Sequence, residues 1–336
     1  MAVVGVHDVA RRAGVSVGTV SNVMNHPQKV APATVARVRA AIDELGFIRN
    51  DAARQLRNGR SKTIGLVVLD VRNPFFTEVA RGAEDAAAEA GLVLTLGNSD
   101  ENTEREANYL DLFEQQRVYG VLISPYADIT GRLLSLRARG IPAVLVDRVS
   151  SDLSFSSVSV DDLAGGALAL QHLADTGRRR IAFVGGPLEI RQVADRLEGA
   201  RRAAAALPGV ELEVIELSAS SVIEGRAAGV AIASRSAETR PDGIFCANDL
   251  VSMGMLQALV MQGSPLRVPQ DVAIIGYDDI DFASAAVVPL SSIRQPSALI
   301  GATAVQILLD EAEDPTIAAR QIEFQPELVA RASTSS

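Results

Sequence analysis

Short polar side chains between residues 16 and 25 could bind DNA, because the pattern around them is that of a helix-turn-helix. Apolar residues recur at helical spacing over 6–13, a glycine follows at position 14, and a second apolar stripe runs through 20–24. Ser16 stands where an N-cap belongs. A short helix, a glycine turn and a capped second helix make a helix-turn-helix. The outward positions of such a second helix fit the major groove of DNA.

The charge distribution favours the same chemistry. Residues 1–62 hold ten Lys and Arg against four Asp and Glu, which gives this segment a net charge of +6, whereas the whole chain carries −9. A basic head on an acidic body is expected when only the head contacts phosphates. The alternative, an ordinary solvated helical surface, is less favoured because the basic residues accompany the helix pattern.

Composition argues against several other functions. Cys246 is the only cysteine, so no intrachain disulfide can form and a reducing cytoplasm fits. The three histidines lie far apart without metal-ligand spacing, and no nucleophile elbow, P-loop or kinase signature occurs. No apolar run approaches the roughly 20 residues that span a bilayer, and no signal peptide is recognisable. We therefore expect no catalytic residues, no metal, no cofactor and no membrane partner.

The elements beyond residue 30 predict a helical head followed by an α/β core. A third helix begins near Pro32 and ends at Gly46, and residues 50–60 form a short, marginal helix. From Thr63 apolar strands alternate with helices, which predicts parallel sheets covered on both faces and a ligand cleft at their carboxyl ends. The expected strands are Ile64–Leu69, Leu92–Leu96, Gly120–Ile123, Ala143–Val146, Ile181–Val184, Leu212–Leu217, Gly243–Cys246 and Val272–Ile275.

These patterns divide the chain into five segments. We expect a DNA-binding helix-turn-helix domain at 1–48 and a hinge helix or linker at 49–62. An N-subdomain covers 63–160, with 291–320 returning to it, and a C-subdomain covers 161–290. Residues 321–336 form a C-terminal segment.

The stretch from Val6 to Asn25 resembles the headpiece of the LacI/GalR family of transcription regulators, and further family-like blocks follow in order along nearly the whole chain. The resemblance implies a small all-α headpiece and a core of two Rossmann-like subdomains, similar to periplasmic sugar-binding proteins and joined by three crossovers. It also implies a homodimer on a near-palindromic operator, controlled by a small molecule. The blocks are T-I-G-L-V-V-L-D-V-R-N-P-F-F (63–76), V-S-V-D-D-L-A-G-G (158–166), R-R-I-A-F-V-G-G-P (179–187), P-D-G-I-F-C-A-N-D (241–249), V-P-Q-D-V-A-I-I-G-Y-D-D (268–279) and P-E-L-V-A-R-A-S-T (326–334).

In the head, the resemblance assigns base reading to Val17, Gly18 and Asn22. Valine can touch a thymine methyl, and asparagine can pair with adenine. Many relatives carry arginine at the position of Asn22. The other implied DNA contacts are phosphate-binding Ser16, Thr19, Ser21 and Asn25, together with Ala53 and Leu56 of the hinge helix, where Leu56 would be a minor-groove wedge. Solvated surface is the alternative for Thr19 and Ser21, helix capping for Asn25, and packing on the core for Leu56.

In the core, the resemblance implies a set of effector-binding residues, most of which follow predicted strands. Their carboxylates and amides can bind ring hydroxyls, and an arginine adds a rigid fork. Capping of a helix is an equal alternative for Asp249, and core packing is an equal alternative for Phe75. A surface ion pair with Arg148 is a less favoured alternative for Asp147, as is a role in a loop turn for Asp278. Ser124 and Gln192 are weaker candidates. Asp161 and Asp162 are expected to cap a helix, with Asp162 also a candidate for a position near the cleft. The implied set is Phe75, Asp147, Arg196, Asn248, Asp249, Asp278 and Gln295.

Three functions remain to be separated. The favoured one is a cytoplasmic, sequence-specific regulator, most often a repressor in this family, whose operator affinity depends on an effector bound between the subdomains. Low aromatic content, 4% with no Trp, favours a small sugar over a purine as effector. An exported sugar-binding receptor would need a signal peptide and no basic head. An α/β enzyme would need a nucleophile–base pair or a metal site. The absence of C-terminal apolar heptads favours a dimer over a tetramer.

Overall fold

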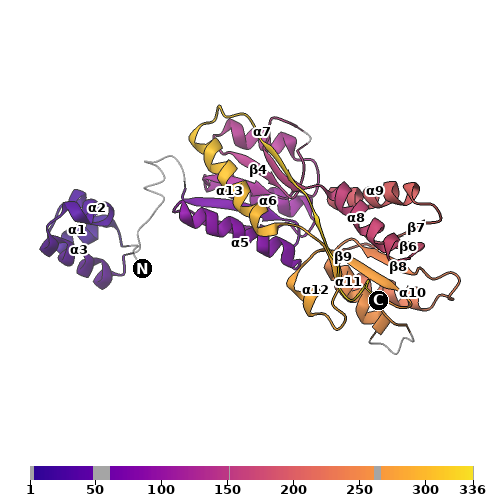
Figure 1. Ribbon diagram of the computed structural model, residues 1–336. Helices are drawn as coiled ribbons and strands as arrows, with labels where there is room; N and C mark the ends of the chain where they lie inside the picture. Colours follow the sequence, from indigo (N-terminus) through magenta and orange to yellow (C-terminus); the bar gives the residue numbers. More distant parts are fainter. Residues whose placement is uncertain (1–3, 48–60, 151, 261–265, 336) are drawn as a thin grey trace. The chain divides into compact units, whose positions relative to one another are not determined.

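The computed structural model describes residues 4–47, 61–150, 152–260 and 266–335. The chain divides into two compact units, residues 1–60 and 61–336 (Figure 1). The helix expected over 50–60, with Ala53 and Leu56, lies outside the described residues. Among the described residues, no helix combines the length and the apolar character needed to cross a bilayer.

The first unit is a three-helix head whose second helix begins where the sequence predicts. Its helices are α1 (Val6–Ala13), α2 (Val17–Asn25) and α3 (Pro32–Leu45), with a 3-10 turn, η1 (Pro27–Lys29), after α2. Gly14 ends α1 in the left-handed region at φ 66°, which a glycine adopts without steric penalty. The buried core of the head consists of Val9, Ala10, Ala13, Val20, Val23, Val38 and Ala41.

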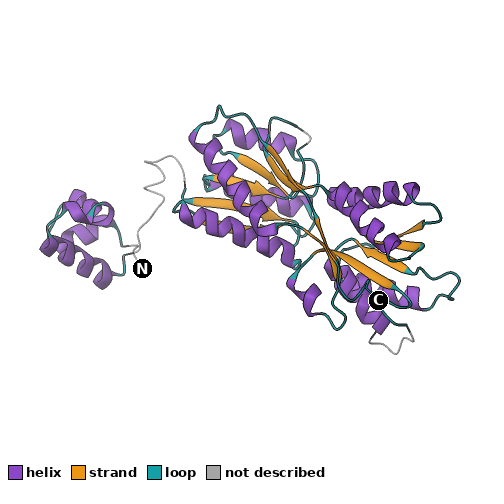
Figure 2. Ribbon diagram, in the orientation of Figure 1, coloured by secondary structure: helices purple, strands orange, loops and turns teal. Residues whose placement is uncertain are grey.

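The second unit contains two α/β subdomains, each built on a six-stranded sheet with helices on both faces (Figure 2). The sheet of the N-subdomain has the order β11-β5-β4-β3-β1-β2, and all its neighbouring strands are parallel. Helices α5 and α13 pack against each other and on this sheet. The elements are β1 (Thr63–Val68), α5 (Pro74–Glu89), β2 (Val93–Asn98), α6 (Thr103–Gln115), β3 (Gly120–Ile123), α7 (Thr130–Ala138), β4 (Ala143–Val146), β5 (Ser157–Val160), α13 (Ser297–Glu313) and β11 (Gln321–Phe324).

The sheet of the C-subdomain has the order β12-β10-β9-β8-β6-β7, and only β12 runs antiparallel to its neighbour. Helix α8 packs with α9, and α10 packs with α11. The elements are α8 (Asp162–Asp175), β6 (Arg180–Gly185), α9 (Arg191–Ala206), β7 (Glu211–Glu216), α10 (Val222–Ala233), β8 (Gly243–Cys246), α11 (Asp249–Val260), β9 (Ala273–Asp278), α12 (Asp281–Ala285), β10 (Ser291–Arg294) and β12 (Glu327–Val329).

The chain crosses between the subdomains three times, after β5, after β10 and after β11. This corrects the expectation that 291–320 returns to the first sheet as a whole. Helix α13 does, but β10 stays in the second sheet, because Ile293 is buried there between β9 and β12. Residues 321–336 are not a separate segment either, since β11 completes one sheet and β12 the other.

Candidate functional site

Helix α2 presents one polar face to solvent. The hydroxyl of Ser16 accepts a hydrogen bond from the Thr19 main-chain N–H at 3.1 Å and so caps the helix. Gly18, Asn22 and Asn25 are exposed at spacings of four and three, which places them on one side of the helix. This face has the dimensions and the hydrogen-bonding groups that a major groove accepts.

Not every residue expected to contact DNA lies fully on that face. Val17 is half-buried and packs against the core of the head, so only part of its side chain is accessible. Thr19 and Ser21 are also half-buried, and Ser21 accepts a hydrogen bond from the Asn25 side chain at 3.2 Å. Two basic residues of the head pair with its own acids, Arg11 with Asp8 and Arg12 with Glu44.

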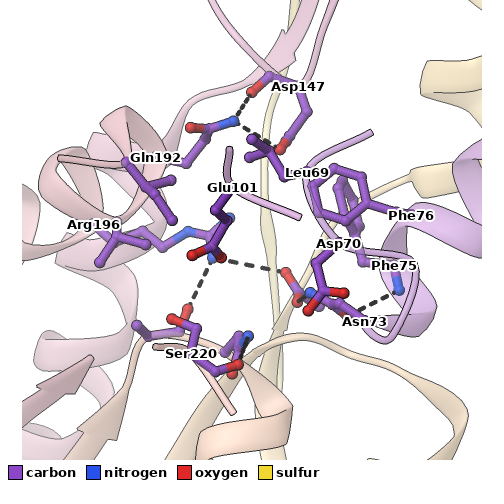
Figure 3. A pocket seen from close by; sticks show the side chains of 15 residues that line it. Leu69, Asp70, Asn73, Phe75, Phe76, Glu101, Asp147, Gln192, Arg196 and Ser220 are labelled. Atoms are coloured by element: carbon purple, nitrogen blue, oxygen red, sulfur yellow. Dashed lines mark hydrogen bonds and ion pairs between the residues drawn. The ribbon is translucent and has the colours of Figure 1, made fainter. Parts of the chain in front are cut away.

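A cleft lies between the subdomains, at the carboxyl ends of strands from both sheets. This is where open α/β folds bind their ligands. Phe75 and Phe76 give it an apolar wall, while amides, carboxylates and one arginine face the same space (Figure 3). The lining residues are Leu69, Asp70, Asn73, Phe75, Phe76, Glu101 and Asp147 from the N-subdomain and Ile190, Gln192, Val193, Arg196, Ser220, Ala247, Asn248 and Asp278 from the C-subdomain.

Two hydrogen-bonded contacts tie the subdomains together across the cleft. The Asn73 amide donates to Asp278 Oδ2 at 2.9 Å, and the Gln192 amide donates to the main-chain carbonyl of Asp147 and to its Oδ2, the latter at 2.9 Å (Figure 3). The cleft holds a cavity of about 50 Å³. On the same measure one water needs about 10–15 Å³, so this cavity has room for a few waters, and a ligand as large as a sugar would need the subdomains to move apart. Opening of the cleft would therefore break these hydrogen bonds.

Arg196 is the central cation of the cleft. Its Nε donates to Asp162 Oδ1 at 2.7 Å and its Nη1 to the carbonyl of Ala247 at 2.8 Å. Asp278 lies 3.8 Å from Nη1, and the guanidinium stacks 3.7 Å above the ring of Tyr277. This single buried charge thus faces several carboxylates and an aromatic ring at once.

Burial shifts the carboxylates around Arg196 towards their neutral forms. Desolvation raises the pKa of Asp147 well above its usual value, and the nearby Asp162 raises it further. Desolvation also raises the pKa of Asp278, although Arg196 opposes the shift. Asp147 and Asp278 adopt positive φ, 58° and 100°. Non-glycine residues with such backbone angles are uncommon and gather at functional sites.

A second cavity, of about 230 Å³, shares Asp147 and Gln192 with the first. It is lined by the segment that leaves β4, by the ends of β5 and β11, and by the starts of α8 and α9. Its remaining lining residues are Arg148, Val149, Ser150, Ser159, Val160, Asp161, Asp162, Leu163, Arg191, Asp195 and Glu323.

Five of the seven expected effector residues line the cleft: Phe75, Asp147, Arg196, Asn248 and Asp278. Asp249 does not, since it is fully buried, and its carboxylate accepts from the Ser292 hydroxyl and the Ile280 main-chain N–H. Gln295 does not line it either; its amide donates to Asp278 Oδ1 at 2.8 Å and so orients that carboxylate. Both positions come soon after a strand as expected, Asp249 after β8 and Gln295 after β10, but their side chains bond to neighbouring protein groups instead of lining the cleft.

The structure shows which of the polar residues near the cleft cap helices. The side chain that caps α11 is Asn248, whose Oδ1 accepts from the Val251 main-chain N–H, and not Asp249. Asp161 caps α8 through Ala164, whereas Asp162 turns inward to Arg196. Ser124 is buried outside the cleft.

Sequence reasoning missed several lining residues. Asp70, Asn73, Glu101 and Ser220 face the cleft from loops that follow β1, β2 and β7. The rule that pointed to Asp147, a polar residue just after a predicted strand, also holds for Asp70. Among the described residues no cluster of His, Cys, Asp and Glu has the arrangement of a metal site.

The buried carboxylates predict a pH-dependent stability. Asp249, like Asp147 and Asp278, has a pKa raised by burial, so the folded state holds its proton more tightly than the unfolded state does. The resulting stabilisation is fully present when the pH is below the pKa of the unfolded chain's carboxyl groups, about 4. It is lost as the pH rises through the pKa of the folded state. We expect the urea concentration at the midpoint of unfolding to decrease as the pH is raised from 5 to 8. Asp249→Asn should make this decrease smaller. Asp271→Asn is the control, because Asp271 is only half-buried and Arg267 lowers its pKa to about 2; an equal flattening of the pH dependence by both variants would contradict the assignment.

Comparisons with known proteins cover both units. Residues 6–50 match the family described as bacterial regulatory proteins, lacI family, and residues 170–334 match a periplasmic binding protein-like domain. The chain is 36% identical to the HTH-type transcriptional repressor PurR of Photobacterium profundum, over 98% of each chain. It is 35% identical to the ribose operon repressor of Escherichia coli K12, over 97% of this chain and 98% of that one. The structure of a lac repressor dimer bound to operator and the anti-inducer ONPF superposes with a TM-score of 0.81 at 27% identity, over 99% of each chain. With a helix-turn-helix head and a two-sheet core, the chain belongs to the LacI family of bacterial transcription regulators.

Proposed function

We propose that this protein is a repressor whose affinity for a near-palindromic operator is controlled by a small polyhydroxylated ligand that binds in the cleft between its subdomains. The observation that carries the proposal is the cleft itself, closed by two side-chain bonds and lined by hydrogen-bonding groups beside two phenylalanines. Such a lining suits a sugar, which offers hydroxyls at its edge and C–H groups on its ring face. The separate helix-turn-helix head favours this function over a receptor without a DNA role.

The ligand and the operator are coupled through the conformation of the cleft. A ligand changes an equilibrium only by its different affinity for the two states. Because a sugar needs the Asn73–Asp278 and Gln192–Asp147 contacts to part and re-form around it, its binding changes how the subdomains are held. Coupling of about 1–3 kcal/mol is typical and reciprocal, so operator DNA would change sugar affinity by the same factor.

A near-palindromic operator requires two heads, and the proposal includes a homodimer. Ile223 and Val230 of α10 are 70% and 49% exposed and stand seven residues apart, on one face of the helix. An exposed apolar face of this kind suits contact with a second copy of the chain. The lac repressor structure reported above is a dimer bound to its operator.

The DNA role is tested by Gly18→Ala. A Cβ at position 18 would meet only Ser16 Oγ, at 3.7 Å, so the head accommodates it, and alanine is the better helix former. The melting temperature of the head should therefore stay level or rise. If this face enters the groove, the methyl group should still lower operator affinity about tenfold, comparable to losing one base contact. Affinity is measured by fluorescence anisotropy on selected operator and on scrambled duplex over a range of salt concentrations.

Ala40→Gly on the exposed side of α3 is the matched control, because it removes a methyl from the head and lowers its stability without touching α2. Its operator affinity should remain that of the parent well below the melting temperature. Adding a panel of neutral sugars to the same assay tests the coupling. A protein that shows no preference for any palindrome over scrambled duplex, at low or high salt, would refute the proposal.

A further inference from the structure

The two adjoining cavities are lined by far more carboxyl groups than cationic groups. Eight carboxylates line them, and three arginines are the only Lys or Arg side chains that do so among the described residues. The arginines are Arg148, Arg191 and Arg196; the carboxylates are Asp70, Glu101, Asp147, Asp161, Asp162, Asp195, Asp278 and Glu323.

Each of the three arginines already has partners within the protein. Arg196 is held by Asp162, and Arg191 donates to both carboxylate oxygens of Asp195 at 2.9 and 2.7 Å. Arg148 donates to the main-chain carbonyls of Pro125 and Ala127. An anion entering the cleft could use only the N–H groups that these partners leave over, and it would add a negative charge among the carboxylates that line the two cavities.

The groups without partners are acceptors. Asp147 Oδ1 and Gln192 Oε1 are buried, line both cavities and have no hydrogen-bond partner within the described part of the chain. Asp147 is 3% exposed and Gln192 4% exposed. Both neighbours of the Gln192 amide nitrogen are acceptors, which fixes its orientation and leaves Oε1 turned away from them. A ligand that donates hydrogen bonds would satisfy both oxygens.

Two further carboxylates, at the N-subdomain side of the cleft, also favour a ligand that donates hydrogen bonds. Asp70 is paired with Arg72, which also binds Asp100, so the arginine nearest this edge is engaged as well. Glu101 lines the cleft from a left-handed backbone position, φ 55°. Burial raises the pKa of Glu101, and repulsion from Asp70 and Asp100 raises it further, so these carboxyl groups lie close enough to interact.

From these observations we infer that the cleft admits only hydrogen-bond-donating ligands without negative charge, and that a ligand bearing an ammonium group in place of a hydroxyl binds more tightly than its neutral parent. The inference rests on the proposed function and narrows its ligand class. Sugar phosphates and sugar acids are excluded, whereas neutral sugars and amino sugars are accepted. Like charges within several ångströms at an effective dielectric near 20 repel by enough to change affinity about tenfold or more.

The test uses matched series on the full-length protein: glucose, glucosamine, glucuronate and glucose 6-phosphate, with the corresponding galactose and mannose series and ribose with ribose 5-phosphate. Thermal shift and calorimetry give the dissociation constants. In any series with a binding member, we expect the amino sugar to bind at least as tightly as the neutral sugar and the acid or phosphate about tenfold or more weakly. An acid or phosphate that binds best overturns the inference but leaves the proposed function standing. Failure of every series to bind overturns both.

A charge reversal gives a second, independent readout. Glu101→Lys should relax the discrimination against the acid and phosphate members and weaken binding of the amino sugar. Glu104→Lys is the matched control, since Glu104 is exposed three residues away and does not line the cleft; its ligand preferences should match the parent's. Unchanged preferences in Glu101→Lys, with the neutral sugar still bound, would show that this carboxylate does not act on the ligand and would overturn its part in the inference.

Discussion

Arg196→Met is expected to lower the free energy of unfolding by about 3–5 kcal/mol, because it leaves a buried carboxylate without its counter-ion. The guanidinium is the hydrogen-bond partner of Asp162 and lies against Asp278 and the ring of Tyr277. Its side chain is only 7% exposed, so water cannot replace these contacts. Desolvation raises the pKa of both aspartates even with the arginine present, and its loss removes the attraction that opposes this shift.

Urea denaturation of the full-length protein at pH 7.5 measures this loss. Arg202→Met is the matched control on the same helix: it removes an exposed arginine paired with Glu198 four residues away, a contact worth about 0.3–0.5 kcal/mol. The double variant Arg196→Met with Asp162→Asn should recover part of the stability, because it removes the orphaned charge as well. If the two arginine variants lost equal stability, or the double variant recovered none, the buried charge would not be the cause.

The architecture of the core could be predicted because local and global signals agree there. Apolar strands alternate with helices, and a strand such as 120–123 is buried at every position, as parallel sheets covered on both faces require. The location of the cleft follows from that topology alone, since the carboxyl ends of parallel strands meet at one edge. The sequence places Asp147 and Asp278 shortly after predicted strands, and both line the cleft.

What could not be predicted depends on contacts between distant residues. Nothing in the sequence S-S-I-R tells whether β10 joins the first or the second sheet, because its apolar residue could be buried in either. The side-chain direction of Asp249 is set by Ser292, which is 43 residues away. A position shortly after a strand places a residue near the cleft. Only the packed structure tells which side chains line the cleft and which instead hydrogen-bond to the residues around it.

Gly166→Ala is expected to destabilise the C-subdomain by about 1–3 kcal/mol or more, although alanine normally stabilises a helix. A Cβ at Gly166 would lie 1.9 Å from the main-chain oxygen of Arg196, and one at Gly199 would lie 2.0 Å from that of Leu163. Helices α8 and α9 thus approach through reciprocal glycines, with no room for a methyl group on either side. The same arrangement recurs between α5 and α13 through Gly82 and Gly301, and between α10 and α11 through Gly225 and Gly254.

The alanine at position 166 can be accommodated only if α9 moves away from α8, and α9 carries Arg196 while α8 begins with Asp162. The variant should therefore weaken ligand binding as well as stability, and urea denaturation and calorimetry measure the two effects separately. Gly131→Ala is the opposite control: a Cβ there meets nothing within 4 Å, so it should stabilise the protein by about 0.5–1 kcal/mol and leave binding unchanged. Equal, small effects from both substitutions would show that α8 and α9 tolerate separation. A loss confined to Gly166→Ala would instead show that the close helix contact holds the ion pair of the cleft in place.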